Sequence, residues 1–314
     1  MRISKRSAGT FLVLVGIFLL ISFQVMHTQV LRFLEIYISP DGEITPGGER
    51  QLDFVVNIFA VMVMVLGYGL IKSEDQSWRN RMRQIFLTDP LCSTEKTLLT
   101  PKFMLISSTV IGLFLILHIR LYDPDSQIFR LLYLEDGIFE SLTPLLMLIS
   151  IGLVGVSIPK LRRDTEFASY RNLVTVIYVF LMIIFFLNAM EEISWGQRIF
   201  NWETPQSFEG NIQNETNLHN YFNQYYLLFY RSLVVFPLII ILSIWLEISR
   251  RYLVINRLVL PHPSLLGLGM LIAIVSLVWY KEQELLEEMF AVFFLFYSLR
   301  IYNCFRLRGK IKPE

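Results

Sequence analysis

Four short stretches of this 314-residue chain place carboxylates, and in one case a histidine, at the ends of long apolar runs. They are residues 135–140, 188–198, 211–220 and 281–288. A carboxylate beside hydrocarbon normally faces a bundle interior or a polar cavity, and by default it marks a functional site. Crowded carboxylates raise one another's pKa, so such a site either holds protons or binds a cation.

The first stretch contains Asp136 and Glu140, which lie four residues apart and share one face of a helix. Capping of the helix N-terminus accounts for Asp136 but not for Glu140, which the apolar run carries further in. The second stretch contains Glu191 and Glu192 at the C-terminal end of a predicted helix. The helix dipole disfavours acids there, so they indicate a pairing with Arg198, metal binding or proton handling.

The third stretch contains His219, the one histidine that we place firmly on the outer side, and it is either a ligand or merely solvated. The fourth contains Glu287 and Glu288, which the following apolar run turns inwards, whereas Glu282 and Glu284 suit a solvated helix start.

Together these side chains predict a divalent metal cation site. The metal ligands would come from Asp136, Glu140, Glu191, Glu192, His219, Glu287 and Glu288. Carboxylate oxygens suit Ca²⁺, Mg²⁺ or Mn²⁺, and Zn²⁺ or Fe becomes possible if the histidine joins. Glu191, Glu192 and His219 are the candidates for catalysis. Cys92 and Cys304 show no CxxC spacing, so we expect two reduced thiols.

The elements that must position these residues are membrane-spanning helices. The chain is 54% hydrophobic and only 18% charged, with a net charge of +1, which excludes a disordered chain and a nucleic-acid binder. Its apolar residues form long uninterrupted runs. We predict an all-α polytopic transmembrane helix bundle of about eight spans, near residues 11–38, 54–71, 103–121, 137–158, 173–190, 227–247, 265–280 and 285–305.

Charge predicts the orientation of this bundle. Eight alternating spans put 21 of the 28 Lys and Arg residues on the side that holds both termini, with eight of the 27 carboxylates. By the positive-inside rule both termini are cytoplasmic, and the four stretches face outwards. We expect one integral membrane domain over residues 1–314 in the cell inner (plasma) membrane. It has a cytoplasmic loop at 72–102 with an amphipathic interfacial helix, and a long outer loop at 191–226.

The strings EEISWGQRIF and NIQNETNLHN, with EDGIFESLT before them, resemble a pattern in uncharacterised multi-pass bacterial membrane proteins. That resemblance implies no activity. A more distant likeness is to the alkaline ceramidase superfamily, seven-helix membrane hydrolases with an intramembrane zinc site. This chain has Glu284 and Glu288 where those proteins carry paired histidines, so the likeness serves as analogy only.

The function predicted from these patterns is a membrane-embedded, metal-dependent hydrolase or transferase that acts on a membrane lipid or a lipid-linked substrate. Two alternatives stay open: a proton- or cation-coupled transporter, and a non-catalytic membrane scaffold. Transport would gain if Arg231 and Glu247 lined an aqueous path.

Overall fold

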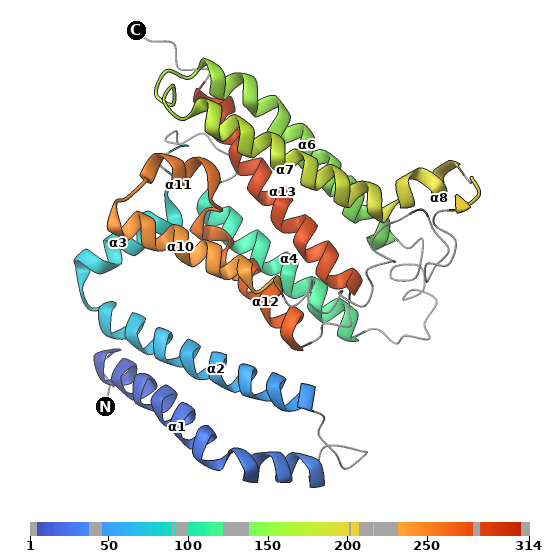
Figure 1. Ribbon diagram of the computed structural model, residues 1–314. Helices are drawn as coiled ribbons and strands as arrows, with labels where there is room; N and C mark the ends of the chain where they lie inside the picture. Colours follow the sequence, from blue (N-terminus) through green and yellow to red (C-terminus); the bar gives the residue numbers. More distant parts are fainter. Residues whose placement is uncertain are drawn as a thin grey trace. The chain divides into compact units, whose positions relative to one another are not determined.

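All regular structure in the described part of the chain is helical, as the computed structural model shows (Figure 1). The described residues are 5–37, 46–89, 91, 100–121, 138–200, 202–206, 216, 232–278 and 283–308. The predicted all-α class is confirmed for these ranges. The chain divides into two compact units, Met1–Gln84 and Ile85–Glu314, and each is described by itself.

The first unit is a hairpin of two long helices, α1 (Lys5–Tyr37) and α2 (Pro46–Lys72), which pack along each other. The hairpin closes on glycines. A Cβ atom built on Gly9 would lie 2.5 Å from the carbonyl oxygen of Gly67, and one on Gly67 would lie 2.6 Å from that of Gly9. Because any side chain would separate the two backbones, glycine at these positions permits the close approach.

A short amphipathic helix, α3 (Gln76–Leu87), follows α2 after a three-residue turn. Its start is capped by Asp75, whose Oδ1 accepts hydrogen bonds from the backbone N–H groups of Ser77 and Trp78. A helix is therefore present within residues 72–102, and its place at a membrane interface stays a prediction. Its last three residues belong to the second unit.

The second unit is a bundle of longer helices joined by short ones. The longer helices are α4 (Pro101–Leu121), α6 (Ile138–Arg163), α7 (Arg171–Glu192), α10 (Val235–Ser249), α12 (Leu266–Val278) and α13 (Gln283–Arg308). Helix α13 packs against α6 and α4, α6 packs against α7, and α12 contacts α4, α10 and α13. Figure 1 shows α6, α7 and α13 side by side.

Helix α7 is apolar on all sides, as a membrane-spanning helix must be. Its inward face buries Val174, Tyr178 and Phe185 completely. Its outward face exposes Val176 and Phe180 by 66% and 61%. A helix in water would place polar residues on that outer face, so α7 is suited to lipid contact.

Among the residues that the structure describes, three helices are long and apolar enough to cross a membrane: Lys5–Phe33 in α1, Ser141–Arg163 in α6 and Arg171–Glu192 in α7. A fourth candidate is a bent pair, Leu253–Val259 with Pro263–Leu277, whose parts meet at 44°. Each predicted span overlaps a described helix, and the candidate spans indicate a multi-pass membrane protein. The number eight and the side of the termini stay predictions.

The bent pair consists of α11 (Leu253–Val259), the 3-10 turn η5 (Pro263–Leu265) and α12. Hydropathy predicts a continuous span that starts at Leu265, and it does not predict the short helix α11 before that span. Pro261 and Pro263 stop α11 from continuing, because neither carries a backbone N–H. His262 lies between them and is buried.

Candidate functional site

The C-terminal end of α7 is a tightly fixed turn. Glu191 Oε1 accepts a hydrogen bond of 2.7 Å from the indole Nε1 of Trp195. The residues after the helix adopt positive φ angles, 46° at Ser194, 55° at Trp195 and 91° at Gly196. Two successive non-glycine residues in the left-handed region are uncommon and strained, which is typical of functional sites. Glu192 is half-buried beside this turn.

Gln197 organises the segment that follows, a role that the sequence analysis missed. Its Nε2 donates to Thr204 Oγ1 at 2.8 Å, and its Oε1 accepts from the backbone N–H of Thr216 at 2.6 Å. Thr216 lies nineteen residues further on, so this one amide holds two parts of the predicted outer loop together. A single sequence offers no signal for such a bridge, since an amide at a helix end is usually solvated.

At the start of α13, a carboxylate is buried without a partner for one of its oxygens. Glu288 is 4% exposed, and its Oε2 makes no hydrogen bond within the described residues. Its neighbours Leu285, Leu286 and Met289 are also buried, whereas Glu284 is exposed and Glu287 half-buried. A charged carboxylate in this setting needs a counter-charge, so Glu288 must either stay protonated or meet a cation.

For three of the other predicted ligands, the side chains lie outside the described residues. Glu140 lies in the first turn of α6, and its side chain is outside the described residues. Asp136 and His219 also lie outside the described residues. Thr143, one turn into α6, is buried.

The predicted elements nevertheless share one end of the second unit. Helices α6 and α13 begin there and α7 ends there, as their packing and Figure 1 show. The rings of Phe185 and Phe294, with centroids 4.6 Å apart, bring α7 and α13 into contact. Among the residues that the structure describes, no three histidine, cysteine, aspartate or glutamate side chains are grouped to hold a metal. A metal site here therefore depends on Asp136, Glu140 or His219.

A second polar centre, which the sequence analysis did not anticipate, surrounds Arg300 on α13. Its Nε donates to Asp89 Oδ2 at 2.6 Å and its Nη2 to Oδ1 at 3.3 Å, and both side chains are 3% exposed. Its Nη1 donates to the carbonyl oxygen of Leu260 at 3.3 Å. A signal was present, because Arg300 is the single charge between Met289 and Phe305 and a buried charge requires a partner.

The C-terminal end of α11 is hydrogen-bonded to side chains at this centre. The Tyr178 hydroxyl donates to the carbonyl oxygen of Leu258, and the Tyr297 hydroxyl donates to that of Val259, both at 2.7 Å. With Arg300 on Leu260, three successive carbonyl groups at a helix end are satisfied by side chains from α7 and α13. The helix end can be buried because its exposed acceptors are paired.

His262 completes the same centre. Its Nδ1 accepts from the backbone N–H of Ser264 at 3.1 Å, and its Nε2 lies 3.2 Å from the carbonyl oxygen of Thr88. A carbonyl can only accept, so Nε2 carries the proton. The ring thus ties the start of α12 to the segment that contains Asp89.

Electrostatics explains why Asp89 tolerates this position. Burial alone would raise the pKa of its carboxyl group, but the charge and hydrogen bonds of Arg300 outweigh burial and lower the pKa to about 2. Asp89 is therefore ionised at neutral pH. The pair fixes the segment before α4 to α13.

Glu247, considered above for transport, is neutralised locally. Its two oxygens accept from Arg257 Nε at 3.0 Å and Nη2 at 3.1 Å, and Oε1 also accepts from Asn256 Nδ2. This pair joins α10 to α11. Arg231 lies outside the described residues, and Glu247 serves a structural contact within the described ones.

Cys304 is disulfide-bonded, so the expectation of a reduced thiol is wrong for this residue. Cys92 lies outside the described residues. Disulfides are typical of oxidising compartments, whereas the charge distribution predicts that this end of α13 is cytoplasmic. The disulfide and the charge-based prediction therefore favour opposite orientations of the helix.

Comparison with known proteins adds no assignment. No family model matches the chain, and no curated protein or solved structure matches it.

Proposed function

We propose that this protein is a membrane-embedded, metal-dependent hydrolase or transferase acting on a lipid or lipid-linked substrate. The observation that carries the proposal is Glu288, a buried carboxylate with an oxygen that no described residue satisfies. Glu288 lies near the start of α13, at the end of the second unit where α6 begins and α7 ends. A structural acid would be expected to have its partner in the fold, as Asp89 has.

In this proposal Glu288 is a ligand for a divalent cation. Further ligands are drawn from Asp136, Glu140, Glu191, His219 and Glu287. A bound cation would polarise a water molecule or a substrate oxygen. One carboxylate left outside the ligand set accepts a proton from the attacking water, and Glu192 is the candidate.

The substrate class follows from the place of the site. Glu191 and Glu192 end α7, and the last turns of that helix expose the apolar side chains of Ile183, Phe186 and Leu187. A substrate with a polar head and an apolar tail reaches such a place laterally from the membrane. The strained turn at Ser194 and Trp195 holds Glu191 against the indole and leaves Glu192 adjacent to it.

The test measures metal content and lipid turnover in the full-length protein purified in mild detergent. We expect about one equivalent of divalent metal in the wild type, and release of a polar product from a total lipid extract detected by mass spectrometry. Glu288→Gln should lose most of the metal and the turnover. Glu192→Gln should lose turnover by about 10²-fold or more.

Glu203→Gln is the matched control, because Glu203 is an exposed carboxylate in the same predicted outer loop and is not a proposed ligand. It should keep both metal and turnover. Wild-type protein that binds no divalent cation, or a Glu288→Gln variant with unchanged metal and turnover, would overturn the proposal.

A further inference from the structure

One end of the first unit collects positive charge, independently of the proposed enzymatic site. The antiparallel packing of α1 and α2 brings the start of α1 beside the end of α2, where Gly9 meets Gly67 and Ile71. Helix α3 starts immediately afterwards. We call the cations there the basic surface: Lys5, Arg6, Lys72, Arg79, Arg81 and Arg83.

The two acidic side chains at this end accept hydrogen bonds from backbone N–H groups. Glu74 Oε1 accepts from the backbone N–H of Arg6 at 3.0 Å, and Asp75 Oδ1 caps α3. Within the described residues, no carboxylate pairs with Arg79, Arg81 or Arg83, and all three are exposed. Their charge is therefore available to an external anion.

Helix α3 has the form of a helix that lies on a membrane surface. Trp78 and Met82 lie one turn apart on a half-buried face, and the three arginines are exposed. The Trp78 ring meets Tyr68 edge to face, with centroids 6.3 Å apart. Tryptophan and tyrosine are enriched at the headgroup level of membranes, and basic amphipathic helices bind anionic lipid. The positive-inside rule alone would explain why lysine and arginine residues gather here, but it would not explain the aromatic side chains on this face.

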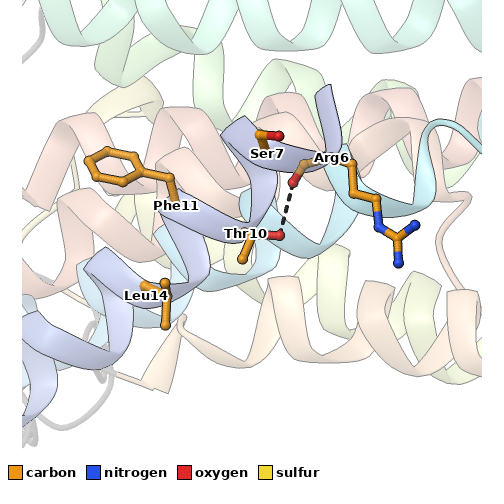
Figure 2. Close-up of a pocket in the computed structure, with 5 residues that line it drawn as sticks. All are labelled: Arg6, Ser7, Thr10, Phe11 and Leu14. Atoms are coloured by element: carbon orange, nitrogen blue, oxygen red, sulfur yellow. Dashed lines mark hydrogen bonds between the residues drawn. The ribbon is translucent and has the colours of Figure 1, made fainter. Parts of the chain in front are cut away.

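A shallow hollow of about 460 Å³ lies on α1, lined by Arg6, Ser7, Thr10, Phe11 and Leu14 (Figure 2). Its lining changes along the helix from a cation and hydroxyl groups to exposed apolar side chains. Thr10 Oγ1 donates to the carbonyl oxygen of Arg6 at 2.9 Å, which fixes the polar end. A molecule that fits this order carries a negative group at one end and hydrocarbon at the other.

We propose that the basic surface binds anionic phospholipids of the adjoining leaflet. In the hollow, Arg6 takes the headgroup phosphate, with Ser7 and Thr10 beside it, and Phe11 and Leu14 lie along the acyl chain. Arg79, Arg81 and Arg83 hold neighbouring headgroups while Trp78 anchors α3 at the interface. A lipid fits better than an acidic protein segment, because α1 is long and apolar enough to span a membrane, and the faces of such a helix that do not pack on α2 would meet lipid.

The test is a lipid titration of the full-length protein in neutral detergent, followed by native mass spectrometry and by the unfolding temperature. Phosphatidylglycerol should bind and raise the unfolding temperature, whereas phosphatidylcholine and inorganic phosphate at equal concentration should not. The triple variant Arg79→Gln, Arg81→Gln, Arg83→Gln should bind phosphatidylglycerol on the order of a hundredfold more weakly. Arg6→Gln alone should weaken it by about fivefold.

The matched control is Arg162→Gln, Arg163→Gln, Arg171→Gln, which removes three exposed cations at the ends of α6 and α7. It should retain phosphatidylglycerol binding. Equal binding of the two phospholipids, or an equal loss in the control and the α3 variant, would overturn the proposal. A response to inorganic phosphate that matched phosphatidylglycerol would also overturn it, because it would show a simple anion site.

Discussion

Helix α13 carries two buried ionisable side chains, and they differ in how fully their polar atoms are hydrogen-bonded. Arg300 sits in a network that satisfies it with both oxygens of Asp89 and a backbone carbonyl group. Glu288, twelve residues earlier and about 18 Å away along the helix, has one oxygen with no described partner. Both side chains are 3 to 4% exposed.

The difference separates a structural centre from a candidate site. Around Arg300, the described groups complement one another and hold α7, α11, η5 and the segment before α4 against α13. Such a network leaves little capacity for a ligand. Around Glu288 the described residues leave one acceptor open, and a fold selected only for stability would not be expected to bury an open acceptor. Variants at the two positions should therefore differ in the sign of their effect on stability.

The largest effect is expected from breaking the Arg300 centre. Arg300→Met keeps the apolar stem but leaves Asp89 buried without its counter-charge. We expect a loss of about 3 to 5 kcal/mol in the free energy of unfolding, seen as a strongly lowered unfolding temperature or loss of the folded protein from membranes.

Two further variants show whether the ion pair causes this effect. Arg306→Gln changes an exposed arginine on the same helix and should alter the unfolding temperature little. Asp89→Leu combined with Arg300→Met should recover much of the loss, because no buried charge then remains. If the double variant were no more stable than Arg300→Met, the ion pair would not be the reason for the loss.

Acid should weaken the same centre by a smaller amount. The pKa of Asp89 is about 2 in the folded protein and near 3.8 when free, so the folded state favours the ionised form. The resulting stability is present above about pH 4 and is lost as the pH falls from about 4 to about 2. It amounts to about 2 kcal/mol.

The measurement is the unfolding temperature of the detergent-purified protein across this pH range. The double variant Asp89→Leu, Arg300→Met lacks the carboxyl group and should decline less steeply between pH 4 and pH 2. Parallel curves for the wild type and the double variant would assign the acid sensitivity to other groups.

Hydropathy predicted the helices well because each long apolar run must bury or shield its backbone. It predicted the α6 and α7 spans almost to their ends, and it placed a basic amphipathic helix where α3 lies. It missed α11, because the apolar run from Leu253 to Leu260 is short and is interrupted by Asn256 and Arg257. It also missed the Asp89–Arg300 pair, whose members are 211 residues apart.

The site was predictable in part for a related reason. The apolar run that follows residue 288 predicted that Glu287 and Glu288 turn inwards; the structure buries Glu288 and leaves Glu287 half-buried. The bond between Glu191 and Trp195 follows the four-residue spacing of a helix. Contacts between distant segments, such as Gln197 with Thr216, depend on how loops return to the bundle, and periodicity holds no information about that. Asp136 and His219 remain predictions for the same reason.

The smallest effect, and the one that most sharpens the contrast, is expected at Glu288. Glu288→Gln keeps the shape of the side chain and removes the possibility of an unpaired buried charge. In metal-free protein at neutral pH we expect stability to be unchanged or to rise by up to about 1 kcal/mol, the opposite sign to Arg300→Met. Adding Mn²⁺ or Mg²⁺ should raise the unfolding temperature of the wild type and leave that of the variant unchanged, because only the wild type gains a ligand that binds the folded state. Glu284→Gln, on the same helix but exposed, serves as the reference. A Glu288→Gln variant destabilised as strongly as Arg300→Met would show that Glu288 has a structural partner, and the two ends of α13 would then no longer differ in kind.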